Sequence, residues 1–337
     1  MFRSIRGLQE GLNIQPNNYE DWSCLAIALL ASQRNEEALN AFNKAVEFNP
    51  ECHEVWYNRA AALIELGRYG EAIACYEKAI EFKPDDHRCW SFRGDIAGFR
   101  YVPTTYDFPL ILNQSPTNLH LKHPELSRRG YPGEVASLTI GLTYCPLNTH
   151  PLGYGFLQRK LGDAHNDYAQ IQQSPRPYWR KAITAYKVAL SVLTADYSEE
   201  RLLTLQSLIH TSLALNEIPD AHHYQTQGSY LYEALRTQAQ DKRTFEAKFS
   251  TFRLTEIDLL IGENEPLLAL TQAEFYKNRA LTWLLDNSQE TTQSPTYDRI
   301  RSHLTPENAI GLLAPIHRLH HHLHPHPRQR RTNSSRL

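Results

Sequence analysis

Side chains that could bind metal ions or phosphate are densest near the carboxyl end of the sequence. Clustered histidines can bind Zn²⁺ or Ni²⁺, and clustered arginines can neutralise the phosphates of a nucleic acid. No recognised ligand spacing orders the histidines, and neither an aromatic platform nor a groove-entering helix accompanies the arginines. We therefore expect a tail without a metal site, and nucleic acid is not favoured as a partner. The side chains concerned are His317, His320, His321, His322, His324, His326, Arg328, Arg330, Arg331 and Arg336.

A cysteine–histidine pair for nucleophilic catalysis is the second possibility. Cys145 has His150 and His165 as its nearest candidate bases in the sequence. A cysteine becomes a nucleophile when a base or a positive charge favours its thiolate, and nothing in the sequence places either histidine beside the thiol. The other cysteines fall at or beside helical repeat positions, where a thiol packs as a small hydrophobic group. These are Cys24, Cys52, Cys75 and Cys89.

Paired acids and close glycines offer no better site. Acids at the start of a helix are explained by the positive end of the helix dipole, and phosphate-binding loops need either a third glycine or a Gly-Lys-Ser/Thr sequence. Neither loop is present, so we predict no catalytic, cofactor-binding or metal-binding residues and no enzymatic activity. The residues considered are Glu36, Glu37, Asp85, Asp86, Glu199, Glu200, Gly153 and Gly155.

Composition and charge limit the class of protein. The 337 residues are 41% hydrophobic and 10% aromatic, enough for a substantial core. The formal net charge of -2 is uneven, because residues 311–337 carry five Arg and no acid, which leaves -7 for the rest. The sequence shows no apolar signal region and no membrane-spanning stretch. Five cysteines without a CxxC pair favour reduced thiols, so we expect a cytoplasmic location and no membrane.

Three tryptophans set the period of an internal repeat. Trp22, Trp56 and Trp90 are each 34 residues apart, and the same period aligns small and aromatic residues between them. The turn position of the first unit carries Gln33 instead of the usual Gly. The residues that we predict to pack the repeats are Trp22, Ala26, Leu29, Ala38, Phe42, Ala45 and Pro50 in the first unit, Trp56, Ala60, Leu63, Gly67, Tyr69, Ala72, Tyr76, Ala79 and Pro84 in the second, and Trp90 and Gly94 in the third.

This pattern resembles the tetratricopeptide repeat (TPR), a pair of antiparallel helices. Large residues two turns apart on the first helix and small residues on the second let the two helices approach closely. Gly67 supplies the turn, and Pro84 ends the second helix. One such hairpin cannot cover its own apolar face, so it stacks on a neighbour. We therefore predict an all-α fold, a TPR solenoid of regular repeats followed by degenerate TPR-like hairpins.

The pattern weakens along the chain. The seven prolines from Pro103 to Pro151 disfavour long helices. Helical periodicity returns afterwards, with eight extra residues between Gly162 and Ala182 relative to a regular unit. We predict repeats over residues 1–100, in units near 19–52, 53–86 and 87–100, a Pro-rich connector with short helices over 101–151, degenerate helical hairpins over 152–287, a linker over 288–310 and a disordered His/Arg-rich tail over 311–337.

Two later segments carry a more specific resemblance. The stretch RGYPGEVASLTIGLTYCPLNTHPLGYGFLQRKLGDAH, with RPYWRKAITAYKVALSVLT, resembles the middle of bacterial TPR–CHAT proteins, in which a TPR array precedes a caspase-like peptidase domain named CHAT. AEFYKNRALTWLLD and SPTYDRIRSHLTPENAI resemble the helix before CHAT and the start of CHAT itself. The resemblance covers roughly residues 20–310 and implies that residues 288–310 are a remnant of CHAT, whose His and Cys pair has no counterpart here.

A shift of reading frame could explain where the resemblance ends. After Ile310 the family would continue with an apolar strand, but this sequence continues with the His/Arg-rich tail. The run from Leu312 to His317 can be encoded by codons that read Tyr-Trp-His-Leu-Ser in a shifted frame. We expect, as a hypothesis that gene sequencing would test, that the tail is out of frame and the CHAT domain truncated.

The remaining surface for function is the concave face of the repeats, formed by first-helix residues that packing does not use. An Asn at the position of Asn58 often binds a ligand main chain in peptide-binding TPR proteins, which the resemblance extends to this chain. We predict a non-enzymatic scaffold that binds a protein or peptide partner. The alternative is the regulatory half of a caspase-like cysteine peptidase system. The predicted partner-binding residues are Glu20, Ser23, Ile27, Glu54, Tyr57, Asn58, Ala61 and Glu65.

Overall fold

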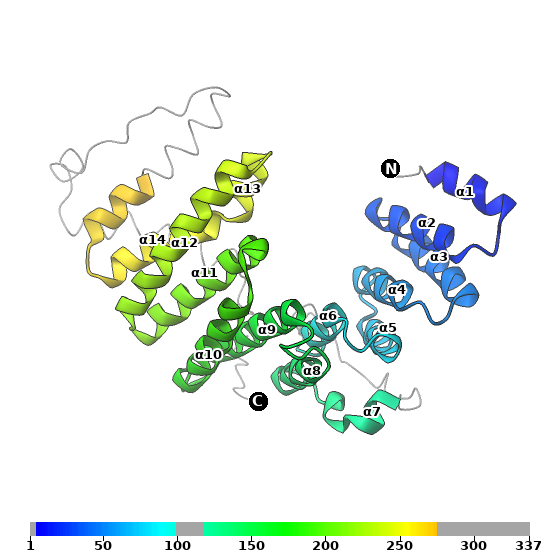
Figure 1. Cartoon of the computed structure of the whole chain (residues 1–337), viewed down its shortest axis with the longest axis horizontal. Helices are drawn as coiled ribbons and strands as arrows, with labels where there is room; N and C mark the ends of the chain where they lie inside the picture. The colour runs from blue at the N-terminus through cyan, green and yellow to red at the C-terminus, as the bar shows by residue number, and fades with distance from the viewer. Residues whose placement is uncertain (1–4, 99–117, 275–337) are drawn as a thin grey trace, which may run out of the picture. The chain divides into compact units, whose positions relative to one another are not determined.

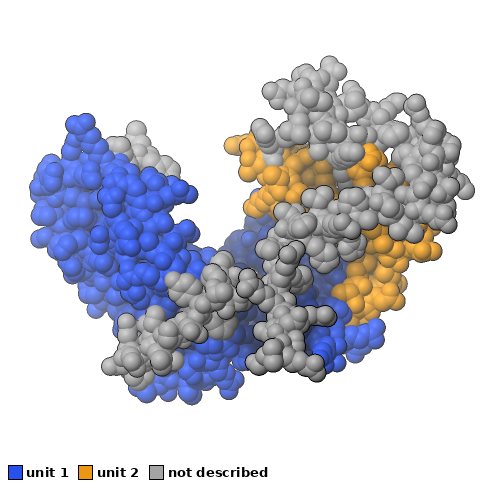
Figure 2. Space-filling model, turned by 180° about the vertical axis from the view of Figure 1, so that it is seen from behind, with its two compact units in different colours: residues 1–211 blue, residues 212–337 orange. Residues whose placement is uncertain are grey.

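The structure is a computed structural model that describes residues 5–98 and 118–274. All the regular elements in these ranges are helices, which confirms the predicted all-α class (Figure 1). The chain divides into two compact units, residues 1–211 and 212–337 (Figure 2). None of the described helices is long and apolar enough to span a membrane. The predicted linker and tail, residues 288–337, lie outside the described residues.

The helices follow one another with short connections. The bounds are α1 Ile5–Ile14, α2 Tyr19–Ala31, α3 Asn35–Phe48, α4 His53–Glu65, α5 Tyr69–Phe82, α6 His87–Ala97, α7 Asn118–Lys122, η2 Pro124–Ser127, α8 Tyr131–Tyr144, α9 Pro151–Gln170, α10 Arg176–Val192, η3 Ala195–Tyr197, α11 Ser198–Leu215, α12 Ile218–Gln238, α13 Lys242–Lys248 and α14 Ser250–Gly262.

Two regular hairpins, α2–α3 and α4–α5, form the predicted first and second repeats (Figure 1). Their small residues Ala26, Ala38, Ala60 and Ala72 are fully buried, which lets the paired helices lie close together. Acids occupy the first turn of each of the four helices, where the helix dipole favours them. The small buried residues and the acids in the first turns therefore both fall where the sequence pattern predicts the helices of the two repeats.

Each repeat tryptophan is held by a hydrogen bond that the sequence pattern did not reveal. The indole N–H of Trp22, Trp56 and Trp90 donates to the carbonyl of the proline six residues earlier, at 2.7, 2.7 and 2.8 Å. These prolines, Pro16, Pro50 and Pro84, are themselves 34 residues apart. Only Trp90 is fully buried, whereas Trp22 and Trp56 are partly exposed. The three tryptophans are therefore not equivalent packing anchors.

The turns inside the hairpins require a left-handed backbone. Gly67 has a φ of 71°, and Gln33, one period earlier, has a φ of 60°. The first repeat thus makes the same kind of turn as the second, with Gln33 in place of glycine. Asn216 and Asn264 have φ values of 64° and 60° after α11 and α14. Asparagine tolerates this region better than most residues, so these two positions mark later turns that glycine spacing could not show.

Replacing Gln33 with glycine should stabilise the first repeat. A side chain strains the left-handed backbone, whereas glycine adopts this conformation freely. Glycine also loses more chain entropy on folding, which offsets part of the gain in stability. We expect the free energy of unfolding to rise by roughly 0.5 kcal/mol and the reciprocal change Gly67→Gln to lower it by a similar amount. Urea denaturation of both variants measures this. Equal signs for the two substitutions would contradict the proposed strain.

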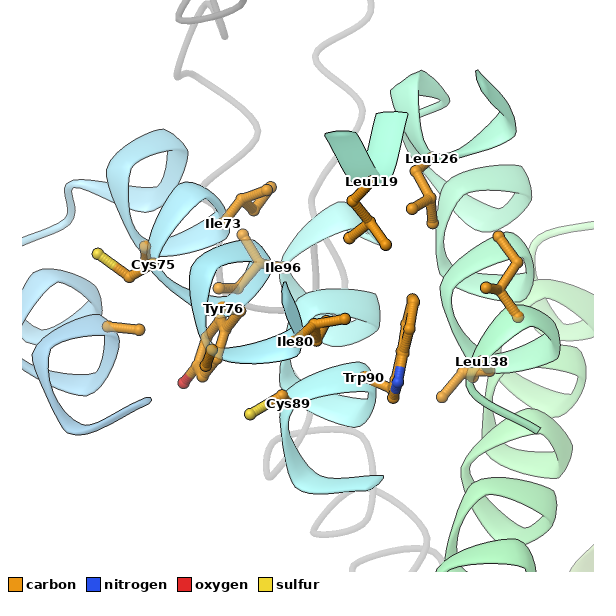
Figure 3. Close-up of a cluster of buried hydrophobic side chains, with 14 of the residues drawn as sticks. Ile73, Cys75, Tyr76, Ile80, Cys89, Trp90, Ile96, Leu119, Leu126 and Leu138 are labelled. Carbon is orange, nitrogen blue, oxygen red and sulfur yellow. The ribbon is translucent and has the colours of Figure 1, made fainter. Parts of the chain in front are cut away.

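The third repeat has its two helices far apart in the sequence. α6 packs against α8, where the Trp90 ring stacks on Tyr144 with centroids 5.5 Å apart. Gly94 on α6 faces Leu138 on α8, because an added Cβ would lie 3.4 Å from the Leu138 side chain. Figure 3 shows Trp90 beside Leu138 in this core. Residues 131–144 were expected within a connector of short helices, but they form a 14-residue helix in this position.

Proline did not prevent this helix because of where it stands. Pro132 is in the first turn of α8, where its missing N–H has no helical partner to lose. The segment before α8 contains the short helices α7 and η2, as expected for a Pro-rich stretch. The buried side chains Leu119 and Leu126 anchor these short elements to the core of α5, α6 and α8 (Figure 3).

The fourth hairpin, α9–α10, is longer than a regular repeat. Gly162 on α9 admits the ring of the buried Tyr186 on α10. α9 extends three residues further past Gly162 than α4 extends past Ala60. α10 begins three residues further ahead of Ala182 than α5 begins ahead of Ala72, and the loop between the two helices has two more residues. These differences account for the eight extra residues found in the sequence. The surplus therefore lengthens the helices more than the loop.

Helix α1 has the character of a second repeat helix. Leu8, Phe42 and Tyr76 are each 34 residues apart, so they occupy the same repeat position on α1, α3 and α5, and all three are buried. Leu8 packs in one cluster with Leu25 and Leu29 of α2. The repeat period thus extends one helix before the first predicted unit.

The unit of residues 212–337 has its own aromatic core. Tyr232 of α12 stacks on Phe252 of α14 and contacts Phe245, which lies beside Phe249. The buried hydroxyl of Thr255 donates to the side-chain carbonyl of Gln225 at 2.6 Å, so the α12–α14 contact also satisfies polar groups. Residues 275–287 of the predicted last hairpin lie outside the described residues.

Candidate peptide-binding face

The predicted partner-binding side chains lie on α2 and α4, the first helices of the first two repeats, and α6 is the corresponding helix of the third repeat. We name the surface formed by these side chains, with Arg88 and Phe92 of α6, the A-helix face. Tyr57 of α4 contacts Phe92 of α6 with ring centroids 5.8 Å apart, which shows that these two helices are neighbours. α2 also contacts α4. The A-helix face is therefore a continuous surface over three repeats.

Tyr57 is used for packing within this face. Its ring lies edge-on to both Tyr76 and Phe92, and the Arg88 guanidinium sits 4.9 Å from its centroid. Burial raises the pKa of the Tyr57 hydroxyl. Arg88 is itself held by Asp86 through two side-chain bonds of 2.9 and 2.7 Å. Tyr57 thus stabilises the contact between α4 and α6 and offers a ligand only part of its ring.

Asn58 lies one residue further along α4 and is only partly buried. Its side-chain amide makes no hydrogen bond to another described residue. An amide has both donors and an acceptor, so it can bind the N–H and C=O of an extended peptide together. Ile27 on the neighbouring α2 is 42% exposed, a level that leaves a large apolar side chain open to a ligand. The small Ser23 and Ala61, both partly buried, leave space on the same helices.

Three predicted acids give the face a negative character. Glu20, Glu54 and Glu65 are exposed. Glu20 and Glu54 are in the first turns of α2 and α4, where the helix dipole already favours an acid. Glu65 is the last residue of α4, where the dipole disfavours an acid. Its negative charge is therefore not explained by helix stability.

Arg88 and Phe92 belong to the A-helix face, although the sequence prediction omitted them. Each lies 34 residues after a predicted site residue, Glu54 and Asn58 respectively. Carrying the period into the third unit would have identified both. Cys24 of α2 is also exposed, unlike the buried thiols of Cys75, Cys89 and Cys145.

A buried polar network fixes α6 behind the A-helix face. The Arg93 guanidinium is fully buried and donates twice to Glu77, at 2.7 and 3.1 Å. It also donates to Ser137 of α8 at 2.6 Å and to the Leu126 carbonyl at 2.8 Å. His120 of α7 lies 2.8 Å from the same Glu77 oxygen. One guanidinium thus connects α5, α6, α8 and the segment between them.

The charge of Glu77 is stabilised by these partners. Desolvation alone would raise its pKa, but the hydrogen bond from His120 and the positive charge of Arg93 outweigh it and lower the pKa. Arg59 stands one period before Arg93 and bonds to Asn43, one period before Glu77. The network is therefore a charged version of a contact that the second repeat makes with a neutral partner.

Cys145, His150 and His165, which were considered above as a nucleophile and its bases, each have partners of their own. The buried Cys145 thiol donates to the Asp85 carbonyl at 3.2 Å, and burial raises its pKa to about 12. His150 bonds the Asp85 carboxylate at 3.0 Å. His165 pairs with the Tyr131 hydroxyl at 2.9 Å, and burial lowers the pKa of the imidazole to about 4. These contacts hold the thiol in its protonated form and use both histidines elsewhere.

Within the described ranges no three His, Cys, Asp or Glu side chains come together as a group that could hold a metal ion. The histidine cluster of residues 317–326 lies outside those ranges. One hollow of about 240 Å³ lies between α5, α7 and α8, on the side of the core where Leu119 packs. It is lined by Ile80, Glu81, Pro84, Asn118, Leu119, Lys122 and Tyr144.

Comparison with known proteins identifies the repeat. Residues 25–87 match the family model of the tetratricopeptide repeat. No curated protein matches the chain. Among solved structures, PilW, a widely conserved type IV pilus biogenesis factor, is 15% identical, with 85% of this chain and 98% of that chain covered and a TM-score of 0.48.

Two further solved structures show a similar level of likeness. PilF of Pseudomonas aeruginosa is 15% identical, covering 72% of this chain and 87% of that chain with a TM-score of 0.43. YrrB, a TPR protein with an unusual peptide-binding site, is 10% identical, covering 73% and 99% with a TM-score of 0.39. Likeness at this level carries no statement of function. The match over residues 25–87 and the 34-residue period show that the chain contains tetratricopeptide repeats.

Proposed function

We propose that the protein is a non-catalytic interaction scaffold whose A-helix face binds an extended peptide segment of a protein partner. The observation that carries this proposal is the Asn58 amide, which is accessible and makes no hydrogen bond to another described residue. In this proposal Asn58 binds the main chain of the peptide. The presence of tetratricopeptide repeats supports a role in protein–protein interaction.

The surroundings of Asn58 suit such a ligand. The exposed Ile27 can pack against one apolar side chain of the peptide, while Glu20, Glu54 and Glu65 favour a peptide with basic residues. The bond from Trp56 to Pro50 and the packing of Tyr57 hold α4 in place. Binding groups on rigid helices lose little entropy when a ligand binds.

The proposal can be tested by selecting peptides from a phage-displayed library on the wild-type chain and measuring their affinity by calorimetry. Asn58→Ala should weaken the selected peptide about tenfold, because it removes two hydrogen bonds to the peptide main chain. Asn40→Ala is the matched control, since Asn40 is an exposed asparagine on the second helix α3. Failure to enrich any peptide, or equal affinity of the two variants, would refute the proposal.

A further inference from the structure

Helix α10 carries an exposed basic face unlike that of the other repeat helices. Its sequence contains four cations and no acid. All four cations are exposed, together with Pro177, Thr184 and Ser191. On α3 and α5, Lys44 and Lys78 pair with glutamates three residues later on the same helix. The cations of α10 are Arg176, Arg180, Lys181 and Lys187.

The start of α10 places positive charge where a helix disfavours it. Arg176 is the first residue of α10, and Arg180 follows one turn later on the same side. The N-terminal end of a helix carries partial positive charge, so cations there are unfavourable. α2, α3, α4 and α5 instead have acids in the first turn. The position of these cations is therefore not explained by helix stability.

The two arginines are available to a partner. Among the described residues neither Arg176 nor Arg180 has an ion-pair partner. The backbone beneath them is rigid, because Tyr178 packs edge-on against both Tyr131 and Tyr168. Lys181 lies 5.5 Å from the centre of the Tyr178 ring, which holds it on the same surface. The cations are thus presented from a fixed helix.

We propose that the exposed face of α10 is a second docking surface, which binds an acidic segment of a protein partner. Carboxylates match guanidinium groups in geometry as well as charge. The row from Arg176 to Lys187 is about 16 Å long at the rise of an α-helix, a length suited to a short peptide segment. This surface is separate from the A-helix face and does not depend on the proposed role of Asn58.

Lipid and nucleic acid fit this face less well. The apolar side of α10, with Ala182, Ile183 and Tyr186, is buried and cannot enter a membrane. Ile171 in the preceding loop is 71% exposed, so vesicles belong in the test. A nucleic acid carries a dense row of charges, and a chain that is net -7 outside residues 311–337 would repel most of them. A short acidic segment needs only the local match.

The test uses the full chain and a fluorescein-labelled glutamate–serine repeat peptide, with binding followed by fluorescence anisotropy at low salt. Arg176→Glu/Arg180→Glu should weaken binding by at least about tenfold. Lys83→Glu/Lys122→Glu makes the same change in net charge at exposed sites outside α10 and should bind as the wild type does. Asn58→Ala should also bind the acidic peptide normally, which separates this surface from the A-helix face.

Thermal unfolding separates loss of binding from loss of structure. Because acids replace cations at the start of α10, the double α10 variant should keep or raise the thermal midpoint. If it unfolds instead, Arg176→Gln/Arg180→Gln decides, and unchanged binding by that variant overturns the proposal. The proposal is also overturned if the wild type does not bind the peptide or if both charge-reversed variants lose binding equally. Tighter, α10-dependent binding of duplex DNA or of phosphatidylserine vesicles would overturn it as well.

Discussion

Replacing Trp90 with alanine should lower the free energy of unfolding by about 3–5 kcal/mol, the range found when a large aromatic residue is removed from a core. Trp90 is fully buried, donates to the Pro84 carbonyl and stacks on Tyr144. Its backbone-proximal atoms also pass close to α8, since a Cβ added to Gly141 would lie 2.8 Å from the Trp90 Cβ. The variant would leave a cavity between α6 and α8 that the surrounding helices cannot close. Urea denaturation followed by circular dichroism measures the loss.

Trp56→Ala is the matched comparison, because Trp56 occupies the same repeat position and makes the same bond to its proline. Trp56 is partly exposed, so its removal loses less buried apolar surface, and the space that it leaves is open to solvent. We expect a loss of about 1–3 kcal/mol for Trp56. An equal or larger loss for Trp56 than for Trp90 would show that α6 and α8 do not form the third repeat.

The sequence could predict the regular repeats because their packing depends on residues at a fixed distance. Trp56, Ala60 and Gly67 each act within a hairpin whose two helices are close in the sequence, so the period alone locates their partners. The third repeat breaks this condition. The partner of α6 is α8, and the intervening residues carry prolines that predict turns. A period of 34 cannot find a helix displaced by an insertion.

Other features were missed because several residue types satisfy the same physical need. The left-handed turn that Gly67 makes in one repeat is made by Gln33, Asn216 and Asn264 elsewhere. The contact of Arg59 with Asn43 becomes Arg93 with Glu77 one period later. The period aligns these residues, but only the structure shows that they touch.

The resemblance to TPR–CHAT proteins stays a prediction. Its N-terminal part is compatible with the repeats of residues 25–87, whereas residues 288–310, which resemble the start of CHAT, lie outside the described residues. The partner-binding residues are likewise a prediction, because a ligand-binding role leaves no packing signature. Asn58 is distinguished by the absence of a described hydrogen-bond partner, and Tyr57 by its packing against Phe92.

Arg93→Ala should be as damaging as Trp90→Ala, for an electrostatic reason. The substitution removes both guanidinium bonds from the buried Glu77, which keeps His120 as a hydrogen-bond partner and Arg129 as a nearby positive charge, and it also removes a donor from Ser137 and the Leu126 carbonyl. Breaking a buried ion pair by removing one partner typically costs about 3–5 kcal/mol. We expect a loss of that size in urea denaturation.

Two variants separate this charge effect from lost packing. Arg59→Ala removes the same side chain from the equivalent position, but its partners Asn43 and Cys75 are neutral and the site is partly exposed, so the loss should be about 1 kcal/mol. Arg93→Met/Glu77→Leu replaces both buried charges by apolar groups and should recover much of the stability, because the buried carboxylate is removed together with the guanidinium. If the double variant is as unstable as Arg93→Ala, then Arg93 acts through its shape and its bonds to Ser137 and Leu126, and the charge of Glu77 is not what requires it. If Arg59→Ala lowers the free energy of unfolding as much as Arg93→Ala does, burial of the Arg93–Glu77 pair does not set the size of the loss. The ion pair would then stabilise the third repeat no more than the neutral contact of Arg59 stabilises the second.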